Sequence, residues 1–152
     1  YHRFNEVEAK NFYKAIQRIK NQYDGDASNI WNGCPSSATV VYRFLEFEGM
    51  GIKIATMAGN ILARQFKIEF SDYYSIDISP DVHVRRVLKR LGYLNENPTI
   101  DQVIYKAREL NPEFPGLIDY SCWEIGRTYC HESNPKCEKC PLNTECKNYI
   151  NR

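Results

Sequence analysis

The sequence predicts an all-α protein. Apolar residues recur at spacings of three and four along most of the chain, as they do on one face of a helix. No stretch of useful length alternates apolar with polar residues, as a half-buried strand would. Glycine and proline separate the periodic stretches. The composition, 43% hydrophobic and 26% charged, suits one globular core or two small helical lobes.

Composition and charge limit the classes of protein to which this chain can belong. No run of about 18 apolar residues is present, so we expect no membrane span. Tyr1–Phe4 contain neither an apolar signal region nor a Met, which points to a fragment or a processed chain. The net charge is only +1, so any nucleic acid would be bound by local basic patches. Two of the six cysteines, Cys34 and Cys122, lie apart from the other four, which fall close together near residues 130–146. Reduced thiols of this kind favour an intracellular location, in the cytoplasm or nucleoid.

The first part of the chain predicts two helices. Residues 5–23 form an amphipathic pattern with a basic outer face, which favours a packing helix over a binding helix. Asp24–Asp26 end it, and a short segment separates it from the next helix. That second helix begins with Ser36 or Ser37 as its cap and runs to about Phe47.

The stretch Gly49-Met-Gly-Ile-Lys-Ile-Ala predicts a hairpin between two helices. Two glycines two apart supply the positive φ or the close backbone approach that such a turn needs. The next helix, Lys53 to about Phe66, is apolar on most sides, so we expect it to be buried. Exposed amides at its start suit a DNA phosphate, which makes Gly49, Gly51 and Ile52 candidate DNA contacts. Taken alone, the pattern fits a plain helical turn as well.

A further helix begins after a loop at residues 67–80. Asp81 starts this helix and Gly92 stops it. One of its stripes is apolar and another is basic. The basic stripe is either a solvated face or a path along a phosphate backbone, and it contains Arg85, Arg86, Lys89 and Arg90. Two more helices are expected, from a Thr99 cap through Leu110 and from Gly116 to about Tyr129.

Four cysteines then fall within one short loop, with gaps of six, two and five residues: Cys130, Cys137, Cys140 and Cys146. Structural zinc usually takes its cysteines from two separate C-x-x-C pairs, whereas only one such pair is present here. A single loop that wraps one centre suits a 4Fe–4S cluster held by four thiolates. Zinc and two disulfides remain the alternatives, although the tight central pair disfavours disulfides. Lys136 and Lys139 lie between the ligands and are candidate DNA contacts.

Three motifs in series resemble the endonuclease III family of DNA glycosylases. Residues 49–55 resemble the family's G-V-G-x-K-T-A hairpin, and residues 81–87 resemble its D-T-H-V-x-R-V segment. The spacing C-x6-C-x2-C-x5-C resembles its cluster loop. The resemblance covers nearly the whole chain. It implies the helix-hairpin-helix glycosylase fold, a C-terminal 4Fe–4S loop and double-stranded DNA with a damaged base or an abasic site as the partner.

The resemblance also implies the catalytic roles. Lys53 corresponds to the family's amine nucleophile, which attacks C1′ of the damaged nucleotide, and Asp81 to its catalytic carboxylate. The base leaves, a Schiff base forms and β-elimination cuts the strand; relatives without this lysine lack an efficient lyase step. An ordinary lysine, with a pKa of about 10.4, is mostly protonated at pH 7 and needs activation. From the residues alone, Lys53 also fits a phosphate contact and Asp81 a plain helix cap.

Two departures from the family pattern stand out. The gap between Lys53 and Asp81 is longer than usual, and the extra residues 71–79 are expected to form a substrate-facing flap or an ordinary surface loop. The chain also begins well inside the family's pattern, so the usual N-terminal helices are expected to be missing. Those helices line the base pocket in the family.

We therefore expect two lobes and an enzyme. Residues 1–66 would form a partial lobe with the hairpin at about 36–66, and residues 67–152 a lobe with Asp81 and the loop at 130–146. The expected activity is a base-excision glycosylase with lyase activity that removes damaged bases, chiefly oxidised pyrimidines. Mismatched thymine or uracil is an alternative substrate. A DNA-binding iron–sulfur module that cuts nothing, or a zinc-binding structural domain, is the alternative to an enzyme.

Overall fold

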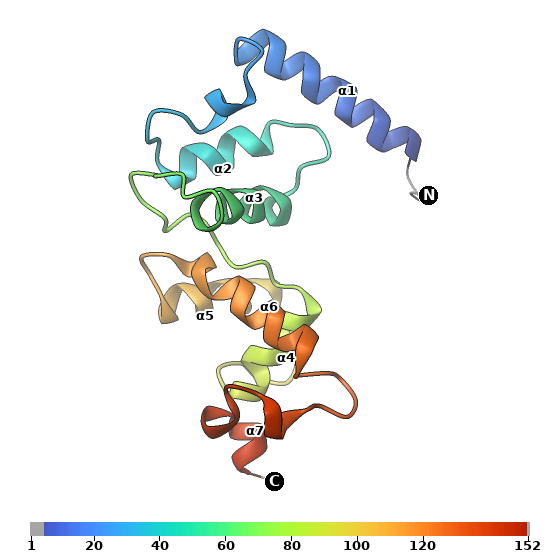
Figure 1. Cartoon of the computed structure of the whole chain (residues 1–152), viewed down its shortest axis with the longest axis vertical. Coiled ribbons are helices and arrows are strands. Elements are labelled where there is room, and N and C mark those ends of the chain that lie inside the picture. Colours follow the sequence, from blue (N-terminus) through green and yellow to red (C-terminus); the bar gives the residue numbers. More distant parts are fainter. Residues whose placement is uncertain (1–4, 152) are drawn as a thin grey trace. The chain divides into compact units, whose positions relative to one another are not determined.

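The structure is a computed structural model that describes residues 5–151, with the side chain of residue 5 left out. Tyr1–Phe4, where the sequence has no signal region, lie outside the described residues. All regular secondary structure in the described chain is helical, which confirms the all-α prediction (Figure 1). It divides into two compact units, up to Ile76 and from Asp77 onward. No described helix is both long and apolar enough to cross a membrane.

The helices of the N-terminal unit begin and end close to the predicted places. They are α1 (Asn5–Gln22), the 3-10 helix η1 (Ala27–Ile30), α2 (Ser37–Leu45) and α3 (Ile52–Arg64). Ser36 is the cap of α2, because its hydroxyl accepts a hydrogen bond of 3.1 Å from the Thr39 amide. The local capping signal in the sequence was therefore sufficient to place the start of this helix.

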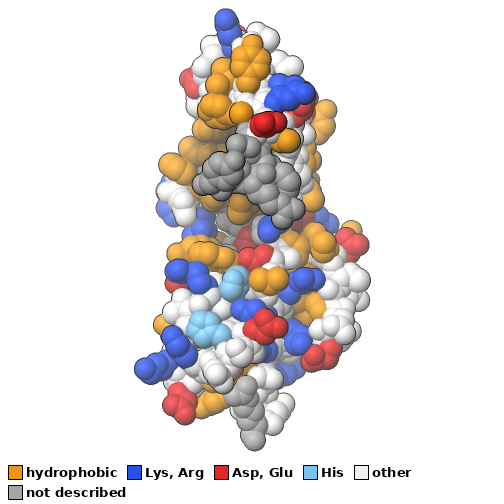
Figure 2. All heavy atoms as spheres, turned by 90° about the vertical axis from the view of Figure 1, so that its right-hand side faces the viewer, with side chains coloured by type: hydrophobic (Ala, Val, Ile, Leu, Met, Phe, Trp, Pro, Cys, Tyr) orange, Lys and Arg blue, Asp and Glu red, His pale blue; other side chains and the backbone are white. Residues whose placement is uncertain are grey.

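The core of the N-terminal unit is small. Tyr23, Ile30 and Phe47 are buried together, with the rings of Tyr23 and Phe47 stacked 6.2 Å apart. Much of α1 remains outside this cluster, since Phe12 and Tyr13 are 70% and 63% exposed. Figure 2 accordingly shows apolar side chains on the surface of the unit that carries α1.

The helix α3 is buried on one side only, so the prediction of a helix buried on most sides was wrong. Its contacts are made to α2, and Ala55 and Leu62 are among its buried residues. Ile52, Ile54 and Met57 are exposed. The helix α2 and the segment after α3 pack against its buried side, and several of its other apolar residues remain exposed among the described residues.

The segment after α3 is anchored in the N-terminal unit and is exposed only in part, for example at Ser71 and Tyr74. Phe70 and Ile76 are buried, and a side chain at Gly59 would meet Ile76 at 3.5 Å. The Ser37 hydroxyl accepts a 3.1 Å hydrogen bond from the Ser75 amide and donates to the Asp72 carboxylate. These contacts make residues 67–76 part of the N-terminal unit.

The C-terminal unit contains the remaining helices. They are α4 (Val82–Leu91), α5 (Ile100–Leu110), η2 (Pro115–Ile118), α6 (Asp119–Thr128), η3 (Cys137–Lys139), η4 (Asn143–Glu145) and α7 (Lys147–Ile150). Thr99 forms a capping box with Gln102 at the start of α5. Gly92 ends α4 with φ +87°, the left-handed conformation that favours glycine. Both ends had been predicted from these residue types.

One continuous core holds the C-terminal unit together. It draws on α4, α5, α6 and the loop that precedes α4, and its buried members are Ile78, Val84, Val87, Leu88, Val103, Ala107 and Cys122. The helices α4 and α6 approach closely at Gly126, where an added Cβ would lie 2.6 Å from His83 Cβ and 3.0 Å from His83 Cα. Only glycine fits this crossing without movement of the backbone.

Candidate functional site

The hairpin between α2 and α3 has the geometry that its two glycines predict. Gly49 has φ +84°, and an added Cβ there would lie 2.5 Å from the side-chain nitrogen of Asn11. Gly51 is the extended N-cap of α3 and provides no side chain to cap it. The first amides of α3, at Ile52 and beyond, therefore lack a side-chain acceptor at the positive end of the helix. Such an end suits an anion.

Lys53 lies in the first turn of α3 and its side chain is exposed. Its backbone carbonyl accepts a 3.2 Å hydrogen bond from the hydroxyl of Thr56, a buried residue one turn later in α3. The amine makes no hydrogen bond or ion pair with any described residue. Solvent, and any molecule that approaches the hairpin, can therefore reach it.

Asp81 is half-buried and caps α4. Its Oδ1 accepts a 2.8 Å hydrogen bond from the Val84 amide. Its Oδ2 makes no hydrogen bond with the described residues, so the capping role leaves one carboxylate oxygen for other work. The backbone just before it is tightly turned, since the Asp81 amide donates to the Ser79 carbonyl at 2.7 Å.

The basic stripe of α4 divides into residues that hold the structure and residues that do not. Arg86 donates through Nε to the Cys130 carbonyl at 2.6 Å and through a terminal nitrogen to the Gly126 carbonyl at 3.1 Å. The same terminal nitrogen lies 2.9 Å from Nδ1 of His83. Arg86 is thus occupied in fixing the start of the cysteine loop and is not a free cation.

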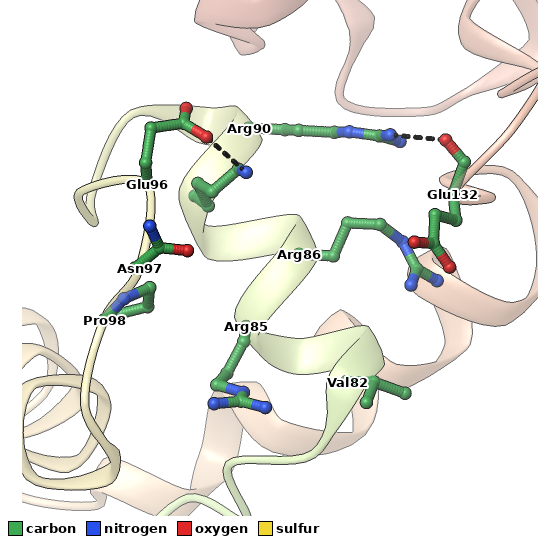
Figure 3. Close-up of a pocket in the computed structure, with 9 residues that line it drawn as sticks. Val82, Arg85, Arg86, Arg90, Glu96, Asn97, Pro98 and Glu132 are labelled. Carbon is green, nitrogen blue, oxygen red and sulfur yellow. Dashed lines mark hydrogen bonds and ion pairs between the residues drawn. The ribbon is translucent and has the colours of Figure 1, made fainter.

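Arg90 has the same kind of role at both ends of the loop. Its guanidinium donates to the Cys130 sulfur at 3.3 Å and to the carbonyls of His131 and Glu132 at 2.6 and 3.0 Å. Its own carbonyl accepts a 3.4 Å hydrogen bond from the Cys146 thiol. Figure 3 shows Arg90 reaching across to Glu132.

A hollow of about 420 Å³ lies against the exposed side of α4. Within it, Lys89 pairs with Glu96 at 2.7 Å, while Arg85 makes no hydrogen bond or ion pair with the described residues. Figure 3 shows Arg85 pointing away from Arg86 and Glu132. Of the four basic residues of the stripe, Arg85 is therefore the one that remains available to a bound anion.

The cysteine loop brings its four thiols into one neighbourhood. The pKa of the Cys140 thiol is raised, chiefly by burial and further by the thiols of Cys130, Cys146 and Cys137. None of these thiols forms a disulfide. Among the described residues, no three His, Cys, Asp or Glu side chains are grouped closely enough to hold a single metal ion. Cys130, Cys137, Cys140 and Cys146 are the thiols that could serve as the four thiolate ligands of a cluster.

Lys136 and Lys139 lie on the outer surface of this loop. Both are exposed, and neither forms an ion pair with the described residues. They border a hollow of about 380 Å³ beside Tyr149. The loop therefore presents these two cations to solvent without an ion-pair partner among the described residues.

One polar contact near Asp81 was missed by sequence reasoning. Asp119, the first residue of α6, is 9% exposed, and its Oδ2 accepts a 3.2 Å hydrogen bond from the Ser79 amide. No local pattern marks this carboxylate, because its partner lies 40 residues earlier. The roles of Arg86 and Arg90 were likewise not separable from that of Arg85 in the sequence, where all four basic residues form one stripe.

Relatives among curated proteins fall into two named groups, and no family model matches the chain. An adenine DNA glycosylase of Buchnera aphidicola subsp. Baizongia pistaciae is 30% identical over 146 residues, which is 94% of this chain and 36% of that relative. An endonuclease III of Thermotoga maritima is 36% identical over 76 residues, 49% of this chain and 35% of that relative. The chain thus spans about a third of the length of these curated relatives.

Solved structures agree on the fold. A trapped covalent intermediate of endonuclease III with DNA matches with a TM-score of 0.60 at 23% identity, over 95% of this chain and 59% of that one. A non-covalent endonuclease III–DNA complex matches with a TM-score of 0.58 at 22% identity, over 95% of this chain and 58% of that one. The chain has the helix-hairpin-helix glycosylase fold, and by sequence and fold together it is a relative of the endonuclease III family of DNA glycosylases.

Proposed function

We propose that this chain carries the catalytic region of a base-excision DNA glycosylase with lyase activity. The observation that carries the proposal is the exposed amine of Lys53 in the first turn of α3, directly after a glycine hairpin with uncapped amides. The amides would hold a DNA phosphate through Gly49, Gly51 and Ile52, and the amine would then lie beside the sugar of that nucleotide.

In the proposed reaction, the Lys53 amine attacks C1′ of the damaged nucleotide as the bond to the base breaks. The base leaves with the bonding electron pair and takes up a proton. The nitrogen then gives up one proton, the C1′–O4′ bond breaks and O4′ takes up a proton, which leaves a protonated Schiff base. Loss of a 2′ proton then expels the 3′ phosphate. The free Oδ2 of Asp81 would stabilise the positive charge that develops on the sugar. The target base must leave the stack to be reached.

Contacts to the DNA backbone would come from the unpaired cations. Arg85 on α4 and Lys136 and Lys139 on the loop have no carboxylate partner among the described residues. Each phosphate that they neutralise would make binding weaker as the salt concentration rises. We also propose that Cys130, Cys137, Cys140 and Cys146 hold a 4Fe–4S cluster. The cluster, when bound, would fix the shape of the loop that presents the two lysines.

Borohydride trapping on a duplex with an abasic site tests the proposal. The wild-type chain should give a covalent adduct with DNA, and Lys53→Gln should give none. Lys10→Gln, which removes an exposed lysine from α1, is the matched control and should trap like the wild type. If the wild-type chain binds the duplex but gives no adduct, the lyase assignment fails and a DNA-binding module that cuts nothing becomes the better account.

The base that is removed needs a separate test. Oxidised pyrimidines are the first proposal, with mismatched thymine or uracil as an alternative. Adenine is a second candidate, because the relatives that match nearly the whole chain are named adenine DNA glycosylase. Single-turnover excision from four duplexes, each with one of these bases at the same position, would separate the candidates. Product from the oxidised pyrimidine alone supports the first proposal, and product from a mispaired adenine alone supports the second.

A further inference from the structure

The turn that leads into α4 is tied to a carboxylate on another helix. The Ser79 amide donates to Oδ2 of Asp119 at 3.2 Å, and the Ser79 carbonyl accepts from the Asp81 amide at 2.7 Å. Asp119 therefore holds one side of the turn and Asp81 the other. Asp119 belongs to α6, the helix that packs most extensively against α4. The contact links the position of Asp81 to the packing of these two helices.

The burial of Asp119 is unusual for its residue type. Aspartate is almost never fully buried unless it is paired, because removal of a carboxylate from water costs free energy. Asp119 is 9% exposed, Ser79 is 5% exposed, and the Ser79 amide is one of the partners of the Asp119 carboxylate. A hydrogen bond from a backbone amide to a charged carboxylate is stronger than one to a neutral acceptor, so Asp119 is suited to fix this amide.

Asp119 and Asp81 are linked through Ser79, whose amide donates to Asp119 and whose carbonyl accepts from the Asp81 amide. The hydroxyl of Ser79 plays no part in the tie, since it makes no hydrogen bond with the described residues.

We propose that Asp119 is the positioning residue for Asp81. Its carboxylate fixes the Ser79 amide, which sets the turn so that Asp81 caps α4 with Oδ1 and keeps Oδ2 without a hydrogen bond to the described residues. The catalytic part of this inference rests on the proposed function, whereas the hydrogen bond itself does not. Asp119 acts through the backbone of the turn and touches no reacting atom.

Loss of the acceptor should lower the rate of base excision and leave DNA binding unchanged. Displacement of a catalytic group by about 1 Å costs up to about 100-fold in rate. For Asp119→Ala we therefore expect the single-turnover rate to fall about 10- to 100-fold, with the Kd for abasic duplex within about twofold, since the proposed phosphate contacts lie elsewhere. Asp119→Asn keeps an oxygen that can accept from the Ser79 amide, so it should retain most of the rate.

The experiment combines amide exchange with kinetics on the full chain. Hydrogen exchange at Ser79, followed by NMR, should be slow in the wild type and in Asp119→Asn, and faster in Asp119→Ala. Ser79→Ala removes only the hydroxyl and should leave both the exchange at residue 79 and the rate unchanged. Asp101→Asn, an exposed carboxylate in the first turn of α5, controls for loss of one negative charge in the same unit.

Each outcome decides the proposal. Fast exchange of the Ser79 amide in the wild type overturns it, whatever the activity. Equal rates for Asp119→Ala and the wild type, or a higher Kd without a lower rate, overturn it as well. If Asp119→Ala does not fold, Asp119→Asn decides the question. A lower rate of base excision in Asp119→Asn, with the Ser79 amide still exchanging slowly, would show that the hydrogen bond to Ser79 does not set the rate, and the proposal would fail. If the wild type removes no base while its Ser79 amide is protected, the proposed function fails and the hydrogen bond stands.

Discussion

The contacts that stabilise the C-terminal unit internally differ from those that stabilise the N-terminal unit. The C-terminal unit has one continuous core, with Val84, Val103 and Ala107 fully buried, and arginine side chains of α4 fasten its last loop. The N-terminal unit has a smaller aromatic cluster and leaves Phe12 and Tyr42 more than 60% exposed. Ion pairs at the surface, such as Lys14 with Glu48, join α1 to the hairpin. Such exposed pairs contribute little to stability.

Because of this difference, a single substitution should lower the free energy of unfolding more in the C-terminal unit than in the N-terminal unit. Contacts in the C-terminal unit involve buried backbone and buried polar groups. When such a contact is removed, water cannot take its place, so the free energy of unfolding falls. Many contacts of the N-terminal unit lie at the surface, where water takes the place of a lost partner. Substitutions placed at matching positions of the two units test this account.

The largest effect is expected at the cysteine loop. Cys140→Ser should abolish iron binding and lower the free energy of unfolding by on the order of 5 kcal/mol, because metal binding contributes directly to folding. The wild type should contain about four iron atoms per chain and absorb visible light, as a 4Fe–4S cluster does. Iron analysis and thermal unfolding provide the measurements. Cys34→Ser, at an exposed cysteine of the N-terminal unit, should change neither. Colourless wild-type protein with zinc and no iron would refute the prediction.

A smaller effect is expected at the helix crossing of the C-terminal unit. Gly126→Ala places a Cβ 3.0 Å from the backbone of His83 and should destabilise the chain by about 1–3 kcal/mol. Gly59→Ala, at a buried helical glycine of the N-terminal unit, meets Ile76 at 3.5 Å, an ordinary contact distance. It should be neutral or stabilise by up to about 1 kcal/mol, because alanine favours the helix. Chemical denaturation measures both. Equal losses of unfolding free energy in Gly126→Ala and Gly59→Ala would contradict the difference that we expect between the two units.

The aromatic cluster of the N-terminal unit should respond to alkaline pH. Burial, and then the charge of Glu46, raises the pKa of Tyr23 above its usual 10.0. The folded state therefore keeps the phenol proton more tightly than the unfolded chain does. Its contribution is present in full below pH 10 and is lost as the pH rises through the folded pKa. Unfolding free energies between pH 9 and 11 should fall less steeply in Tyr23→Phe than in the wild type. Parallel curves would show that Tyr23 contributes nothing to the slope.

The smallest effect on stability is expected on the outer face of α1. Phe12→Ser changes a side chain that is 70% exposed, so the free energy of unfolding should move by no more than about 0.5 kcal/mol. Self-association at high concentration should decrease, since an exposed apolar patch is lost. Sedimentation velocity with parallel denaturation would test both parts. A loss of several kcal/mol would mean that α1 packs more tightly than its exposure indicates.

Helix ends were predictable because their signals are local. Ser36, Asp81 and Thr99 each accept a hydrogen bond from an amide within the next three residues, and Gly92 takes the left-handed conformation that its position requires. These interactions involve neighbours in the sequence, so residue type alone identified them. The hairpin at Gly49 and the order of the helices followed from the same kind of signal.

Contacts between distant residues were not predictable in this way. The segment Ile76–Ser79 was expected to lie at the surface, yet all four of its residues are buried. Asp77 is held by two hydrogen bonds of 2.8 Å from Arg108, which lies 31 residues later. The basic stripe of α4 gave no indication that Arg86 and Arg90 bind carbonyls of the cysteine loop. In each case the partner is set by packing, which the local pattern does not encode.

The contacts of Arg90 have a consequence for the order of folding. Its partners Cys130 and Cys146 follow it by 40 and 56 residues. Contacts this far apart form late, because the entropy of closing the intervening chain must be overcome first. During synthesis, α4 is complete before any cysteine of the loop exists. The cysteine loop is thus shaped on a helix that is already present, and its two outer cysteines are brought to the same arginine.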